Sequence, residues 1–166
     1  MQWNFAHSIT DTMKKIKLYL DTSVISHLDA PDTPEKMAET SAFWDILKTG
    51  QYDVLISRTV LDEIGRCEEP KRTFMEAKLA EIELIVLERT LESRELAKDY
   101  IAKNVLSQKS FDDCMHIALS VINHCDYLVS WNFRHLVNVR TVAGVKVVNA
   151  INNYREISIV SPNMLI

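Results

Sequence analysis

Glycine and proline are scarce in this sequence, with three and four residues respectively among 166. Because flexible linkers are rich in these two residues, their scarcity predicts one compact unit rather than domains joined by tethers. The length is typical of a single domain and is sufficient to bury a sizeable core. Long apolar stretches are also missing. No run of eighteen apolar residues is present, which argues against a membrane-spanning helix.

Cysteine is the next scarce residue. Cys67, Cys114 and Cys125 make an odd number without the spacing of a disulfide framework, and this favours the reducing cytoplasm. The sequence also has no Cys-x-x-Cys pair and no His-Glu-x-x-His run, so the spacing expected of a zinc site is missing. We therefore expect a cytoplasmic protein without a zinc centre.

The first twelve residues contain no apolar block and do not resemble a secretory signal. The run Met13-Lys14-Lys15-Ile16 reads like a second possible start, directly before the first strand-like segment. We interpret residues 1–12 as an N-terminal extension whose status the sequence leaves open, and residues 13–166 as one domain.

Strand-like and helix-like segments alternate along the rest of the chain. Strands are expected at 16–20, 54–57, 84–87, 127–131 and 145–148, before a polar tail that ends in 157–160. Helices are expected at 24–28, 35–48, 60–67, 71–82, 92–105 and 112–123, and Gly50 is expected to end the second helix. Such alternation predicts an α/β fold, a three-layer sandwich in which helices cover both faces of a central, mostly parallel sheet.

Acidic and polar side chains stand at or just past the ends of these strands. Asp21 directly follows the first strand, and Glu63 lies in the helix after the second. Asp113 opens the last predicted helix, and Asn132 follows the fourth strand closely. Because parallel strands direct their carboxyl ends to one edge of the sheet, these groups can converge there. Gathered carboxylates repel one another, and a hard divalent cation with oxygen ligands is the usual solution.

Each acid also has a purely structural explanation. Asp21 is a suitable N-cap for the helix that follows it, and Glu63 alone would be a solvated helix residue. Ser110 and Asp113 fit the reciprocal helix-start pattern.

Periodicity adds little to the choice between the two acids of the last helix. Counting 100° per residue puts Asp113 and Ser120 opposite its buried stripe, with Asp112 and His116 at the border. Which of the two acids points into a site is therefore left open.

Four segments also resemble the signature blocks of a known family. Residues 18–25, 57–64 and 112–118 look like the three acidic blocks of PIN-domain ribonucleases, and in particular of the VapC-type toxins of bacterial toxin–antitoxin pairs. Residues 128–136 are similar to the end of the family's fourth strand. The resemblance covers nearly the whole chain from about Lys14 onward.

This resemblance implies a function and a set of site residues. The family's metal-binding acids fall on Asp21, Glu63 and Asp113, and its fourth position, often Asp, is Asn132 here. An amide cannot act as a base, although its oxygen can orient a metal or a water. The implied activity is Mg²⁺- or Mn²⁺-dependent hydrolysis of RNA phosphodiester bonds. The family further implies a homodimer that is inhibited by a cognate antitoxin protein.

Neighbouring residues complete the expected site. Ser23 and Ser130 would orient the carboxylates, and Asp112 would be an extra acid that offsets Asn132. Nearby basic residues that could contact RNA phosphate are Arg58, Arg66, Lys109, Arg134 and His135.

Trp131 and Phe133 are expected to pack in the core or at its rim rather than to stack on bases. Two alternatives to the nuclease stay open. One is an RNA- or protein-binding module with the same fold whose chemistry is impaired by Asn132. The other is a metal-dependent phosphatase that acts on small substrates.

Overall fold

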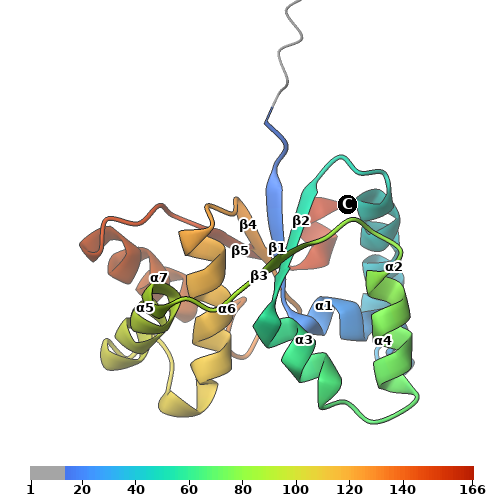
Figure 1. Ribbon diagram of the computed structural model, residues 1–166, viewed down its shortest axis with the longest axis horizontal. Coiled ribbons are helices and arrows are strands. Elements are labelled where there is room, and N and C mark those ends of the chain that lie inside the picture. Colours follow the sequence, from blue (N-terminus) through green and yellow to red (C-terminus); the bar gives the residue numbers. More distant parts are fainter. Residues whose placement is uncertain (1–13) are drawn as a thin grey trace, which may run out of the picture.

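The computed structural model describes residues 14–166 (Figure 1). Its centre is one five-stranded sheet in which every neighbouring pair of strands is parallel. The strands are β1 (Lys17–Leu20), β2 (Asp53–Ser57), β3 (Ile85–Leu87), β4 (Tyr127–Val129) and β5 (Ser158–Val160). The predicted α/β fold with a central parallel sheet is confirmed. The expected N-terminal extension, residues 1–12, lies outside the described residues.

Helices connect the strands. They are α1 (Thr22–Ser26), α2 (Pro34–Lys48), α3 (Arg58–Gly65), α4 (Lys71–Leu79), α5 (Leu91–Ala102), α6 (Phe111–Ile122) and α7 (Val139–Ile151), with short 3-10 segments η1 (His27–Asp29), η2 (Gln108–Ser110) and η3 (Pro162–Leu165). Gly50 ends α2 as predicted, because its φ is +73° and its N–H donates to Leu47 O. Within residues 14–166, no helix has the length and apolarity needed to cross a membrane.

The last predicted strand is wrong. Its valine-rich run, Val145–Val148, lies inside α7, and the fifth strand is β5 in the segment taken for a polar tail. The two ends of the run are buried whereas the two residues between them are exposed, which is helical spacing rather than strand alternation. A cap also begins the helix, because Asn138 Oδ1 accepts a hydrogen bond from Thr141 N at 2.9 Å.

The sheet buries a different set of strand side chains on each face. Tyr19, Leu55 and Leu128 belong to the core that α5, α6 and α7 cover. Leu18 and Ile56 belong to the core that α1, α2, α3 and α4 cover. Figure 1 shows the two helical layers on either side of the sheet. Alternation along β1 and β2 thus gives the three-layer architecture.

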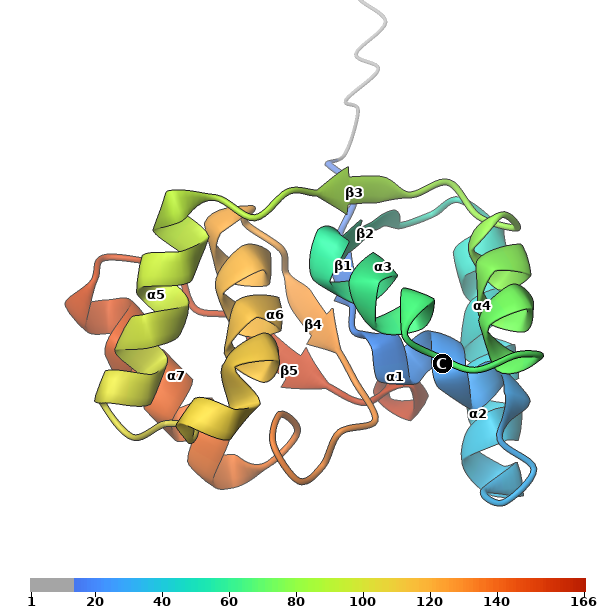
Figure 2. The same ribbon diagram turned by 60° about the horizontal axis from the view of Figure 1, so that its bottom comes forward.

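The strand order determines where a site can form. The sequence runs β1, β2, β3 toward one side and then returns to place β4 and β5 on the other side of β1, giving the order β3-β2-β1-β4-β5. After the carboxyl end of β1 the chain continues into one helical layer, and after that of β4 it continues into the other. In parallel sheets, such a switch point opens a crevice between the two strand ends. In Figure 2, α3 and α6 lie on either side of this region.

Candidate active site

Asp21 is the first residue after β1, and it is 4% exposed. Its Oδ1 accepts hydrogen bonds from Ser23 N at 3.1 Å and Ser23 Oγ at 2.5 Å, while its Oδ2 accepts one from Ser130 Oγ at 2.7 Å. Asp21 therefore caps α1 and is also tied to the end of β4. Burial raises the pKa of Asp21, although nearby His116 and the two serines oppose that rise.

Glu63 lies on α3 and is held by two neighbours. Thr22 Oγ1 donates a hydrogen bond to Oε2, and His116 Nε2 lies 3.2 Å from the same oxygen. The other ring nitrogen of His116, Nδ1, is 2.8 Å from Tyr19 Oη, which is in turn 2.6 Å from Ser57 Oγ. A buried hydrogen-bonded row thus runs from the end of β2 to Glu63.

His116 carries the electrostatic coupling between the acids. Burial favours its neutral form, yet the hydrogen bond and charge of Glu63, together with the charges of Asp21 and Asp113, raise the pKa of His116. Burial likewise opposes ionisation of Glu63, but His116 and Thr22 outweigh it and lower the pKa of Glu63. The charges of all three predicted acids thus favour the charged form of this buried imidazole, and Glu63 is the acid in contact with it.

Asp113 belongs to a second hydrogen-bonded group, on the side of α6. Its Oδ1 accepts from Asn132 Nδ2 at 3.1 Å, and its Oδ2 is 2.8 Å from His135 Nδ1. Asn132 Oδ1 accepts from His135 N at 2.9 Å, and Asn132 N donates to Ser130 Oγ at 2.8 Å. Because Ser130 also contacts Asp21, the chain of contacts runs unbroken from Asp21 through Asn132 to Asp113.

The structure separates the two neighbouring acids of α6. Asp112 is half exposed and lies 3.6 Å from Arg66 Nη1, outside the network around Asp113. Ser110 makes no capping hydrogen bond, so the helix-start explanation of Asp113 is wrong. Ser110 Oγ instead lies 3.3 Å from His135 Nδ1.

The predicted face of α6 is wrong as well. Ser120 is fully buried and His116 is 2% exposed, and all residues from Cys114 to Val121 are buried. Helix α6 contacts α5, β4 and α3, and these neighbours cover it on several sides. The helical-wheel count, which assumes a single buried face, therefore did not identify His116 as a partner of the acids. The signal for it in the sequence was that His116 follows Asp113 by three residues.

The side chains suit a hard divalent cation by their chemistry, since carboxylate, amide and hydroxyl oxygens are the ligands that Mg²⁺ and Mn²⁺ prefer. In their present positions, however, these side chains point to neighbouring residues rather than to one common metal position. Among residues 14–166, no three acidic, histidine or cysteine side chains converge as the ligands of one metal ion. Asp113 is directed to Asn132 and His135, and Glu63 to His116.

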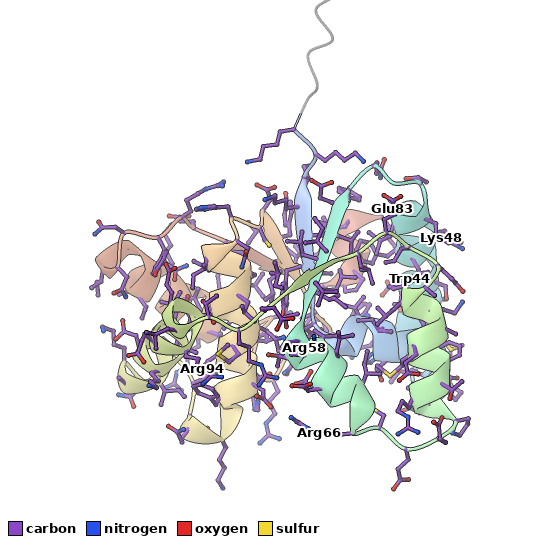
Figure 3. The ribbon with its side chains drawn as sticks, viewed as in Figure 1. Trp44, Lys48, Arg58, Arg66, Glu83 and Arg94 are labelled. Carbon is purple, nitrogen blue, oxygen red and sulfur yellow. The ribbon has the colours of Figure 1, made fainter. Side chains whose placement is uncertain are left out.

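Two arginines expected near the site are paired with acids. Arg58 and Arg66, at the two ends of α3 (Figure 3), contact Glu88 at 3.1 Å and Asp112 at 3.6 Å respectively. Arg134 and His135, by contrast, line a cavity of about 380 Å³.

The aromatic pair after β4 lies in the core and at its rim, as expected. Trp131 is buried and donates Nε1–H to Thr40 Oγ1 at 2.8 Å, whereas Phe133 is 45% exposed. A larger cavity of about 660 Å³ is lined by Lys48 and Glu83, toward the opposite end of the strands (Figure 3).

Comparison with known proteins identifies the family. A family model described as PIN domain matches residues 17–134. No curated protein matches the sequence significantly.

Two similar solved structures share the fold. VapC20 of Mycobacterium tuberculosis, a toxin that cleaves the sarcin–ricin loop, is 17% identical with a TM-score of 0.56, covering 71% of this chain and 92% of that one. VapBC2 from Rickettsia felis, bound to a DNA fragment from its promoter, is 11% identical with a TM-score of 0.56, covering 88% and 98%. With the family model spanning most of the described sheet and the acids at its edge, the chain belongs to the PIN domain family.

Proposed function

We propose that this protein is a metal-dependent endoribonuclease that hydrolyses RNA phosphodiester bonds, as the toxin of a toxin–antitoxin pair. Membership of the PIN domain family supports a nuclease. The carrying observation is that Asp21 and Asp113 are joined through Ser130 and Asn132 at the switch point of the sheet, while Glu63 accepts a hydrogen bond from Thr22, the residue after Asp21. Three acids from separate elements that are linked by hydrogen bonds at a sheet edge where ligands bind favour catalysis over packing.

Asp21, Glu63 and Asp113 would hold Mg²⁺ or Mn²⁺. The bound ion would activate water and neutralise charge on the phosphate. The protein's own residues do the positioning. Ser23 and Ser130 fix both oxygens of Asp21, and His116 with Thr22 fixes Glu63.

Asn132 orients Asp113 rather than serving as an acid. Its Nδ2 donates to Asp113, and its Oδ1 is already engaged by the backbone of His135. An amide in this place removes one negative charge, so fewer cationic charges are needed to balance the site.

We further infer a cognate antitoxin protein as partner, a homodimer, and action in the cytoplasm. The VapC-like fold supports the first two by analogy with the family. The three cysteines are free, which suits a reducing compartment.

Cleavage of a mixed RNA pool tests the activity, with Mg²⁺, with Mn²⁺ and with EDTA. The variants are Asp21→Asn and Asp113→Asn, and Asp112→Asn is the matched control because it changes the same charge one residue away. We expect cleavage by the wild type and by Asp112→Asn in either metal, no cleavage in EDTA, and a loss of at least about a hundredfold in the two site variants.

A catalytically impaired module that binds RNA or protein is the second candidate, and Asn132 with its engaged amide favours it. Folded wild-type protein that binds the RNA pool without cutting it in either metal would support this module and overturn the nuclease. Hydrolysis of p-nitrophenyl phosphate without RNA cleavage would instead indicate a phosphatase. Cleavage that survives EDTA and both substitutions would show that these acids are not the site.

A further inference from the structure

A polar cavity of about 380 Å³ opens beside Asp113. Its walls come from the turn after α5 and from the segment between β4 and α7, and they include Ser107, Ser110, Arg134, His135, Arg140 and Thr141. His135 belongs to both the cavity and the candidate active site, because it lines the cavity while its Nδ1 lies 2.8 Å from Asp113 Oδ2. A ligand in the cavity therefore lies one side chain away from the proposed catalytic acid.

All charged residues that line this cavity are basic, whereas a mostly apolar cavity of about 420 Å³ has Lys146 as its one charged residue. No aspartate or glutamate lines the first of these, although the chain as a whole carries a net charge of −4. The cavity of about 660 Å³ mixes Lys48 with Glu81 and Glu83, and another of about 440 Å³ mixes Lys98 with Glu95 among other charges. A lining whose charged residues are all basic, on an acidic protein, is complementary to an anion.

In the part of the chain that the structure describes, the two arginines of the cavity have no acidic partner. Within residues 14–166, neither Arg134 nor Arg140 lies within 4 Å of a carboxylate oxygen, whereas Arg58 and Arg66 each form an ion pair. Both side chains are exposed. The planar guanidinium fork of arginine matches two oxygens of a phosphate, so unpaired arginines at a cavity mouth suit that ligand.

The walls of the cavity are held in place by the protein itself. Thr141 Oγ1 donates to His135 O at 2.8 Å, and Asn138 Nδ2 donates to Arg134 O at 3.1 Å. These bonds fix the backbone that carries both Arg134 and His135. The cavity is thus preformed, and a ligand would not have to order it.

On the opposite wall, α7 approaches closely at Gly144. A Cβ atom added to Gly144 would lie 3.0 Å from Val105 Cγ2, so only glycine permits the present spacing without a shift. Asn104, with φ of +57°, turns the chain there, and Val105 N donates to Tyr100 O at 2.9 Å to close the end of α5.

We propose that this cavity binds a backbone phosphate of single-stranded RNA next to the scissile bond, through Arg134 and Arg140. The inference rests on the proposed nuclease function and deepens it, because it assigns the substrate a second point of attachment. A nucleotide bound there would be aligned with the acids by His135, which joins the two sites.

Binding of a fluorescein-labelled eight-nucleotide RNA of mixed sequence, followed by anisotropy in EDTA, tests the cavity separately from catalysis. The full chain carrying Asp21→Asn serves as background and is compared with the same chain carrying also Arg134→Ala and Arg140→Ala. Arg94→Ala with Lys14→Ala is the matched control, since these exposed basic residues remove the same charge and lie outside the cavity lining.

Loss of the two cavity arginines is expected to weaken binding by about tenfold per arginine. The slope of log affinity against log salt should fall by about 0.7 for each phosphate contact removed. The control pair should change affinity less than about threefold, which reflects net charge alone. Arg140→Gln alone, on the exposed first turn of α7, gives a readout if the double variant fails to fold.

The outcomes distinguish the two proposals. Equal binding by the cavity pair and the control pair would overturn the phosphate site, even if the wild type cleaves RNA with metal. Binding that depends on Arg134 and Arg140 in a wild type that cuts no RNA would support the site and overturn the nuclease. No measurable RNA binding by the Asp21→Asn chain at low salt would overturn the site as well.

Discussion

His116 Nε2 lies 3.2 Å from Glu63 Oε2, deep between the two helical layers, and it is the closest histidine–glutamate contact of the described chain. The ring is 2% exposed and its other nitrogen is held by Tyr19. Helix α6 from one layer and α3 from the other are thereby joined at the site. A positioning residue of this kind affects both the stability of the fold and the orientation of the acid.

Replacing His116 by alanine should remove one of the two hydrogen-bond partners of the Tyr19 hydroxyl and one of the two partners of the Glu63 carboxylate, and leave a cavity where the ring was. We expect a loss of about 1–3 kcal/mol in the free energy of unfolding. Urea unfolding followed by circular dichroism measures this, with Gln108→Ala on the exposed η2 turn as control. A variant that unfolds at the wild-type urea concentration would show that the contact contributes no stability.

Asn132→Asp would place a carboxylate where Asn132 Nδ2 now lies 3.1 Å from Asp113 Oδ1. Two carboxylates at that separation repel unless a cation or a shared proton lies between them. We expect a lower Tm in EDTA and a larger rise in Tm on adding Mn²⁺ than for the wild type, measured by differential scanning fluorimetry. Gln51→Glu adds the same charge at an exposed position and controls for net charge. Identical Mn²⁺ shifts in all three proteins would contradict the expectation.

Asp21→Asn should stabilise the metal-free protein at pH 7. Burial raises the folded-state pKa of Asp21, so keeping this acid ionised in the fold costs stability above that pKa. Below the usual pKa of an aspartate, the acid is protonated in the folded and the unfolded chain, and the cost vanishes.

Thermal unfolding in EDTA across pH measures this difference. The Tm of Asp21→Asn is expected to exceed that of the wild type at pH 7 and to converge with it as the pH falls toward about 3, below the usual aspartate pKa. Exposed Asp32→Asn should show no such pH-dependent gain. A metal-free Asp21→Asn that melts below the wild type at pH 7 would show that Ser23 and Ser130 fully offset the burial of the charge.

The cysteines should differ sharply in reactivity. Burial raises the pKa of the Cys114 and Cys125 thiols to about 12, whereas Cys67 is partly exposed. Because the thiolate is the reactive form, iodoacetamide at about pH 8 is expected to label one cysteine in the folded chain and three in urea, as counted by intact mass. Labelling of all three without denaturant would mean that α6, which carries Cys114, and the turn after it, which carries Cys125, both open readily.

Much of the fold was accessible from the sequence because β1, β2 and β4 are short apolar runs, each ending at a polar residue. The same pattern directed attention to Asp21 and Asn132, since residues just beyond the carboxyl end of a parallel strand lie at the edge where ligands bind. The prediction of a strand over Val145–Val148 was wrong because the preference of β-branched residues for strands is weak and gives way to capping and packing. There the Asn138 cap and the packing of one face determine a helix.

The contacts of the site were less accessible. His116 is buried because Tyr19 of β1 and Glu63 of α3 lie against it, and helical periodicity within a single segment contains no information about such neighbours. The cavity beside Asp113 joins Ser107 to Arg140 across more than thirty residues, so it exists only once α7 packs against the end of α5. Paired and unpaired arginines look alike in sequence, and only their surroundings separate Arg66 from Arg134.

Gly144 determines how closely α7 approaches the turn after α5. Alanine at this position would gain about 0.8–1.0 kcal/mol in helix propensity, yet it would push against Val105 in the cavity wall. The distance between α7 and the turn after α5 is therefore set by a residue that is not itself part of the cavity lining. Larger side chains there would move the turn after α5 and so change the size of the cavity, although Gly144 would not touch a molecule bound in it.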